Sequence, residues 1–120
     1  MSFQSDLGKF AKATGLEIEV VVGKLAFDVL KSVIEKTPIK TGRAKANWNL
    51  GLGSINYTTT KSTTFKLSVP PKGSGNKVIY ITNSLPYITS LENGDSKQAR
   101  GGMVKPTMSE INRSIRSVIR

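Results

Sequence analysis

The sequence of 120 residues contains no cysteine and no histidine. Without cysteine there is no disulfide framework and no thiolate metal site. Without histidine there are no Ser–His or Cys–His nucleophile pairs, and the commonest general base is missing. We therefore expect a protein that is not an enzyme and that uses no metal or other cofactor.

Long hydrophobic runs are also missing. No apolar stretch approaches the ~20 residues of a transmembrane helix, and the first ten residues, MSFQSDLGKF, lack the pattern of a secretory signal. We expect a soluble protein made inside the cell, with no membrane contact. Apolar residues make up only 38%, which is somewhat low for a globular domain. That composition fits a small single domain over residues 1–120 with extended polar loops, and it also fits a domain that completes its burial against partners.

Carboxylates are absent from the middle of the chain, between Lys36 and Glu92. Residues 1–36 carry five lysines and five acids, so they are neutral. The net charge of +10 comes from residues 37–120, which have thirteen basic residues and three acidic ones. The sequence therefore predicts a strongly positive surface, for which a polyanion is the natural partner. A surface that only keeps the protein in solution remains the alternative.

The hydrophobic pattern predicts an α+β fold, with a long N-terminal helix on a small, mostly antiparallel sheet, a short helix and a C-terminal helix. Apolar residues at spacings of three and four predict the long helix over Leu16–Lys36. It should end near Thr37, because Pro38 disfavours helical geometry in the preceding residue. Residues 1–15 carry a weaker helical pattern and are interpreted as a mobile arm or a helical extension.

Three strands are predicted after Trp48. They are residues 50–57 (LGLGSINY), the alternating stretch Phe65–Val69, and residues 77–84 (KVIYITNS). Two helices should follow. Pro86 is expected to start a short helix that stacks Tyr87 on Leu91 and ends with Gly94 in a left-handed conformation. An amphipathic helix is expected from about Pro106 to Arg120.

Two segments have some features of chemical sites. GSGNK, at residues 73–77, resembles a phosphate loop but leads into a predicted strand, so it reads as a hairpin loop. Asp95 and Lys97 have the spacing of half a nuclease metal site, with Glu92 as the one carboxylate close enough to complete it. A metal-dependent nuclease therefore stays a weaker alternative. Glu92 is otherwise expected to pair with one of the many cations.

The dodecapeptide TPIKTGRAKANW, residues 37–48, joins the long helix to the first strand. Thr41 is a plausible N-cap for a short helix that begins at Gly42. Trp48 reads as a core anchor, with base stacking as the alternative. Arg43 and Lys45 should point outward to a neighbouring subunit, a phosphate or water. Their double change to Glu is expected to leave the fold intact.

EKTPIKTGRAKANW and the later stretch NSLPYITSLENGDSKQARGGMVKPTMSEI resemble two blocks of a tail-component family of tailed double-stranded DNA bacteriophages. The matching residues of the first block are Thr37, Pro38, Thr41, Gly42, Arg43 and Trp48. Those of the second are Asn83, Pro86, Tyr87, Leu91, Glu92, Gly94, Ser96, Lys97, Gln98, Gly102, Met103 and Val104. The sequence departs from the family pattern at Lys40, Asn93 and Arg100-Gly101.

The resemblance implies a structural virion protein at the head-proximal end of the tail: a tail terminator, tail-completion or neck protein. Such subunits close into rings, commonly hexamers, that join the tail tube to the head connector and let genomic DNA pass. The candidate assembly or lumen contacts are Arg43, Lys45, Glu92, Lys97 and Arg100. The candidate structural positions are Pro38, Thr41, Gly42, Trp48, Pro86, Tyr87 and Gly94. A small basic nucleic-acid-binding module remains the main alternative.

Overall fold

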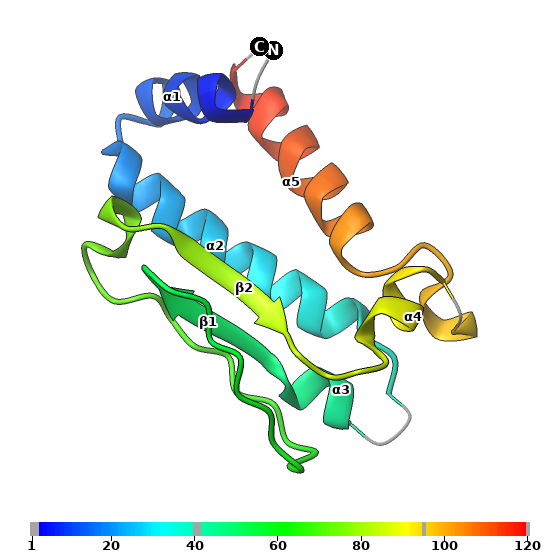
Figure 1. Cartoon of the computed structure of the whole chain (residues 1–120). Helices are drawn as coiled ribbons and strands as arrows, with labels where there is room; N and C mark the ends of the chain where they lie inside the picture. Colours follow the sequence, from blue (N-terminus) through cyan, green and yellow to red (C-terminus); the bar gives the residue numbers. More distant parts are fainter. Residues whose placement is uncertain (1–2, 40–41, 95, 120) are drawn as a thin grey trace.

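The computed structural model describes residues 3–39, 42–94 and 96–119. Its elements are α1 (Phe3–Thr14), α2 (Ile18–Lys36), α3 (Arg43–Ala46), β1 (Trp48–Leu52), η1 (Ser74–Asn76), β2 (Ile79–Asn83), α4 (Ile88–Glu92), η2 (Lys97–Ala99) and α5 (Val104–Ile119). The long helix α2 lies between the sheet and α5, and α1 crosses from the start of α2 to the end of α5 (Figure 1). The predicted α+β fold is confirmed.

Helix α2 matches its prediction within two residues. It buries one broad stripe, which includes Val21, Leu30 and Val33. It ends at Lys36, and Thr37 has extended backbone angles (φ −74°, ψ 131°). This is the conformation expected of a residue that precedes proline. At about 1.5 Å per residue the helix is about 28 Å long, in a subunit that measures 42 × 27 × 19 Å.

The N-terminal residues form a helix of their own. Gly15, at φ 73°, ends α1 and changes the chain direction before α2 begins. Helix α1 packs on α5, where Asp6 is buried and lies 3.7 Å from Arg116 Nε. Of the two interpretations of residues 1–15, the helical one therefore describes residues 3–14.

The sheet has two antiparallel strands, with Trp48 opposite Asn83 and Leu52 opposite Ile79. Strand β2 confirms the third predicted strand. The first prediction holds only as far as Leu52, because Gly53 (φ 76°) ends β1 and donates its N–H to Val78 O at 2.8 Å. Helix α2 covers one face of this sheet.

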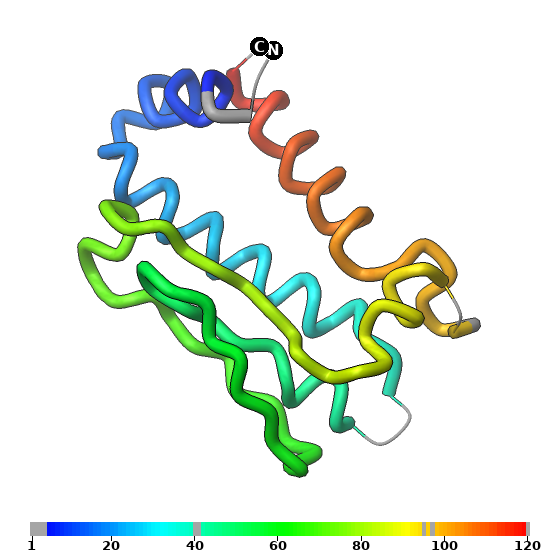
Figure 2. The backbone as a smooth tube through the Cα atoms, viewed as in Figure 1, coloured from blue at the N-terminus to red at the C-terminus, as the bar shows by residue number. Residues whose placement is uncertain are grey.

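The predicted strand Phe65–Val69 is wrong. No strand forms between Leu52 and Ile79. Residues 53–73, which we call the arm, run along the sheet and then return in a second limb (Figure 2). Polar residues of the second limb, Thr64, Lys66 and Ser68, line a groove beside β1. Apolar and polar residues do alternate here. The apolar side chains, however, point away from the core, and no strand of the same subunit covers them.

The core lies where the C-terminal half of α2 meets the sheet and the segment before α5. It contains Leu30, Val33, Ile34, Trp48, Ala99 and Met103. Helix α4 begins two residues after Pro86, with Tyr87 at its N-cap, and Gly94 follows in the expected left-handed conformation (φ 88°). Helix α5 begins at Val104, two residues earlier than predicted.

Candidate assembly surfaces

Thr37 and Trp48 connect the two ends of the dodecapeptide. The indole N–H of Trp48 donates a hydrogen bond to Thr37 Oγ1 at 2.8 Å, and the Thr37 hydroxyl donates to Val33 O at 2.5 Å. Thr37, Pro38 and Trp48 are all buried. Trp48 therefore anchors the first strand to the end of α2, in agreement with its predicted role in the core.

Lys45 contacts the end of α2 and does not point into solvent. Its Nζ donates to Ile34 O at 2.8 Å and to Glu35 O at 3.4 Å. These carbonyls belong to the last turn, whose acceptors have no partners within the helix and carry the negative end of its dipole. Lys45 is thus a C-terminal cap of α2. A change to Glu at this position would weaken the fold, so it would not isolate an assembly role.

Arg43 and Gly42 contact the arm. Arg43 Nε donates to Thr60 O at 3.4 Å. Gly42 is the N-cap of α3 at φ 84°, and a Cβ there would lie 2.5 Å from Thr63 O. The close approach of the arm and the left-handed angle both require glycine. The predicted N-cap Thr41 lies outside the described residues.

Glu92 caps the N-terminus of α5. Its Oε1 accepts the N–H groups of Met103 at 3.0 Å and Val104 at 2.9 Å, and its Oε2 accepts that of Lys105 at 3.3 Å. A carboxylate at this end of a helix is favoured by the free N–H groups and by the helix dipole. Gly102 allows the approach, since a Cβ on it would lie 2.7 Å from Glu92 Oε2. Glu92 thus pairs with backbone N–H groups where the sequence predicted a cation.

The two sequence blocks meet in space although they are far apart in the chain. Gln98 Oε1 accepts the N–H of Ile39 at 2.8 Å, and Asn83 Nδ2 donates to Ala44 O at 2.9 Å. Each bond links the first block to the second. The sequence reasoning gave neither Gln98 nor Asn83 a role, although both belong to the matched motifs. The residues of the two motifs therefore pack together in one region of the fold, at the C-terminal end of α2.

Four other candidates remain at the surface or without a described contact. Arg100, Pro86 and Tyr87 are exposed. Lys97 begins η2, and its side chain lies outside the described residues. The assembly and lumen roles of Arg100 and Lys97 stay predictions.

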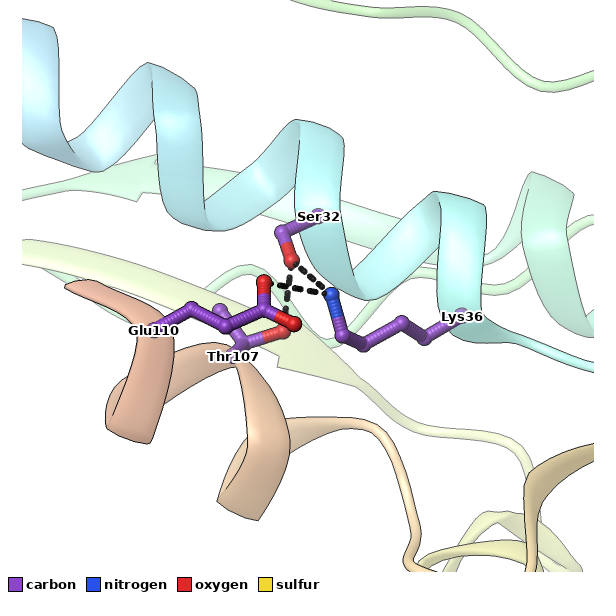
Figure 3. Close-up of polar contacts among 4 residues, drawn as sticks. All are labelled: Ser32, Lys36, Thr107 and Glu110. Atoms are coloured by element: carbon purple, nitrogen blue, oxygen red, sulfur yellow. Dashed lines mark hydrogen bonds and ion pairs between the residues drawn. The ribbon is translucent and has the colours of Figure 1, made fainter. Parts of the chain in front are cut away.

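A polar cluster fixes α5 against α2 (Figure 3). Lys36 Nζ donates to Ser32 Oγ at 2.7 Å and to Glu110 Oε2 at 2.9 Å. The hydroxyls of Ser32 and Thr107 lie 2.9 Å apart, and Thr107 is fully buried. Because the buried Thr107 hydroxyl and the polar groups around it pair with one another, this contact favours one register of the two helices.

An apolar groove of about 450 Å³ opens between α2, α5 and β2. Its lining includes Val22 and Val29 from α2, Met108 and Ile111 from α5, and Ile79 from β2. The polar cluster fixes α2 and α5 relative to each other. The groove therefore leaves part of the hydrophobic interior of the subunit open.

The catalytic alternatives receive no support from the described geometry. Over residues 3–39, 42–94 and 96–119, no three acidic side chains come together in a way that would hold a metal ion. Asp95, on which the nuclease hypothesis depends, lies outside these residues. The segment resembling a phosphate loop forms η1 and leads into β2, and its Gly75 packs directly on the backbone of Glu19.

The sequence was compared with known protein families, with curated proteins and with solved structures. Residues 2–94 match the model of the HK97-gp10-like family, whose description is that of a tail component of bacteriophage HK97. The match spans 93 of the 120 residues (94 − 2 + 1), so this chain belongs to that family of tailed-phage tail components. It is accordingly a structural protein of the virion. No curated protein and no solved structure matches the chain.

No helix in the described part of the chain has the length and apolar content needed to cross a bilayer.

Proposed function

We propose that the chain is the subunit of a ring at the head-proximal end of the phage tail, as a tail terminator, tail-completion or neck protein. The ring, of six copies, joins the tail tube to the head connector and lets genomic DNA pass. Subunits would assemble in the cytoplasm of the bacterial host.

The observation that supports this proposal best is incomplete burial of apolar surface. The groove beside β2 is open, and the apolar side of the arm is uncovered. Monomeric proteins rarely expose large contiguous apolar patches, and such patches usually mark interaction sites. In a ring each subunit would cover part of its neighbour, which accounts for an apolar content of 38%.

The charge of such a ring is larger than the enclosed DNA could neutralise. Six copies would carry 6 × 10 = 60 positive charges. A ring as tall as a subunit, ~30 Å, would enclose duplex DNA with roughly 18 phosphates, at one per ~1.7 Å. Most of the cations would therefore face neighbouring subunits, acidic surfaces of adjoining rings, or solvent. The contact with DNA is non-specific and involves a minority of the basic residues.

Mass measurement in solution tests the ring. Six copies of 13.0 kDa give 6 × 13.0 = 78 kDa, and negative-stain images should show closed rings. A single copy at all concentrations, together with its absence from assembled virions, would overturn the proposal.

The net charge of +10 also supports a second candidate, a small nucleic-acid-binding module. That candidate predicts tight binding to free duplex, with an affinity that falls steeply as salt rises. A ring subunit instead predicts weak binding to free duplex and strong self-association. Titration of a labelled duplex at two salt concentrations separates the two functions.

A further inference from the structure

One side of helix α5 is polar and basic along most of the length of the helix. Helix α5 lies at one border of the subunit, with α2 and the sheet on its other side (Figure 1). At spacings of three and four residues, the side turned away from α2 carries Lys105, Ser109, Asn112, Arg113 and Arg116. We call these five residues the basic face of α5. All of them except the half-buried Asn112 are exposed.

The cations of the basic face are poorly balanced by acids. Among the residues that the structure describes, no carboxylate oxygen lies within 4 Å of Lys105 or Arg113. Glu110, the one acid of α5, pairs with a lysine of α2. Arg116 lies 3.7 Å from the buried Asp6, but its side chain remains 56% exposed. The basic face can therefore attract an anion of another molecule.

A polar hollow of about 380 Å³ lies on this side of α5. The residues that line it are Ser109, Asn112, Arg113, Arg116 and Ser117. This lining contains no acid and no apolar side chain. Its guanidinium, amide and hydroxyl groups can all donate hydrogen bonds, and two of the five residues are cationic. A phosphate group, with its charged acceptor oxygens, matches such a lining.

The composition of the basic face favours nucleic acid over an acidic protein as its partner. An interface between proteins has an apolar centre that is depleted of charged residues, whereas this face has no apolar residue. Interfaces with DNA are more polar and much more positively charged. Lys105 also lies in the first turn of α5, where the helix dipole disfavours a cation. The stability of the helix therefore does not explain its presence.

We propose that the basic face of α5 contacts the phosphate backbone of duplex DNA and lines the lumen of the ring. This inference rests on the proposed function, because it names the minority of basic residues that contact the DNA there. Lys105, Arg113 and Arg116 give at most 6 × 3 = 18 positive charges in six copies. A ring ~30 Å tall encloses roughly 18 phosphates. Contacts with phosphates carry no sequence information, which suits the passage of a whole genome.

The variant K105Q/R113Q tests this contact. Both side chains are exposed, and neither takes part in an ion pair of the described structure, so the fold should remain. Fluorescence anisotropy measures the binding of a short labelled duplex from low to physiological salt. The variant should bind more weakly, and the slope of log K against log salt should fall by about 1.8 per bound copy, or ~0.9 for each lost phosphate contact. Circular dichroism confirms that the variant is folded.

Two further variants serve as controls. K61Q/K72Q removes the same charge from two exposed positions of the arm, which contains no carboxylate, and should keep the wild-type slope. K105R/R113K keeps both charges and should bind as wild type does, because the contact with phosphate depends on charge. If the arm variant lost as much affinity as K105Q/R113Q, binding would follow net charge, and the assignment to α5 would be overturned. A wild-type chain that did not bind duplex at low salt would also overturn it.

The outcomes separate this contact from the ring. Rings of six copies whose affinity for duplex is the same in wild type and K105Q/R113Q would overturn the DNA contact and leave the ring proposal standing. If that variant were also missing from assembled virions, the basic face would contact an acidic protein instead of DNA. A chain that stays a monomer, but whose binding to duplex depends on Lys105 and Arg113, would support the contact and contradict the ring.

Discussion

Trp48 Nε1 and Thr37 Oγ1 lie 2.8 Å apart and form a buried hydrogen bond between residues eleven positions apart. The Thr37 hydroxyl in turn donates a hydrogen bond to Val33 O, in the last turn of α2. One hydroxyl thus satisfies a buried indole donor and a helix carbonyl together. This relay explains why threonine precedes the proline that follows α2 and why tryptophan begins β1.

Changing Thr37 to Val should remove both bonds while nearly preserving the shape of the side chain. The indole N–H of Trp48 would then be buried without a partner, which costs about 1–3 kcal/mol of unfolding free energy. Urea denaturation measures the loss. Thr37→Ser keeps the hydroxyl and should recover most of the stability. If the valine variant matched wild type, the relay would have no role in stability.

Changing Glu92 to Gln should loosen the start of α5. The amide keeps one acceptor oxygen but removes the charge that three backbone N–H groups share, so we expect a loss of about 1–2 kcal/mol. Hydrogen exchange should accelerate at Met103, Val104 and Lys105. Glu110→Gln is the matched control, because its ion pair with Lys36 is more exposed and should contribute less than ~1 kcal/mol. Equal effects of the two changes would contradict the capping role.

The sequence predicted elements well where a local signal sets them. Pro38 determines the end of α2, and Gly94 takes the left-handed angle that was expected of it. The position of Trp48 between the predicted helix and the first predicted strand also indicated that it belongs to the core. These signals act within a few residues of the chain, so one sequence is sufficient to read them.

The prediction failed where a distant contact decides the outcome. Alternation placed Phe65, Leu67 and Val69 on one face, but it could not show that no strand of this subunit pairs with them. Lys45 was assigned to the surface, although the carbonyls that it caps lie ten and eleven residues earlier. Residue spacing alone does not show which side chain will cap the end of a helix, because the fold brings that side chain there.

Gly75 and Gly23 should respond in opposite directions to alanine. A Cβ on Gly75 would clash with the backbone oxygen of Glu19, so Gly75→Ala should push η1 away from α2 and cost about 1–3 kcal/mol. Nothing lies within 4 Å of a Cβ on Gly23, in the interior of α2. Gly23→Ala should therefore stabilise the helix by about 0.5–1 kcal/mol. Thermal unfolding of both variants would show whether the signs differ, and a stabilised Gly75→Ala would contradict the close packing of η1.

Glu17 gives a prediction for pH. A hydrogen bond with Glu19, and then the charge of Glu19, raise the pKa of Glu17 above its ordinary value. The two glutamates line a concavity at the start of α2, which Lys24 and Lys72 also line. A carboxyl with a raised pKa in the folded state favours folding when protonated, and this contribution is lost as pH rises through the raised pKa. Glu17→Gln should therefore match wild type at acidic pH and become more stable than wild type as the pH approaches neutrality.

Urea midpoints across this pH range measure the difference between Glu17→Gln and wild type. Glu35→Gln, at an exposed position of the same helix, is the control and should show no such trend. A difference that stayed constant with pH, or that shrank as the pH rose, would show that the two carboxyls do not repel each other in the folded subunit.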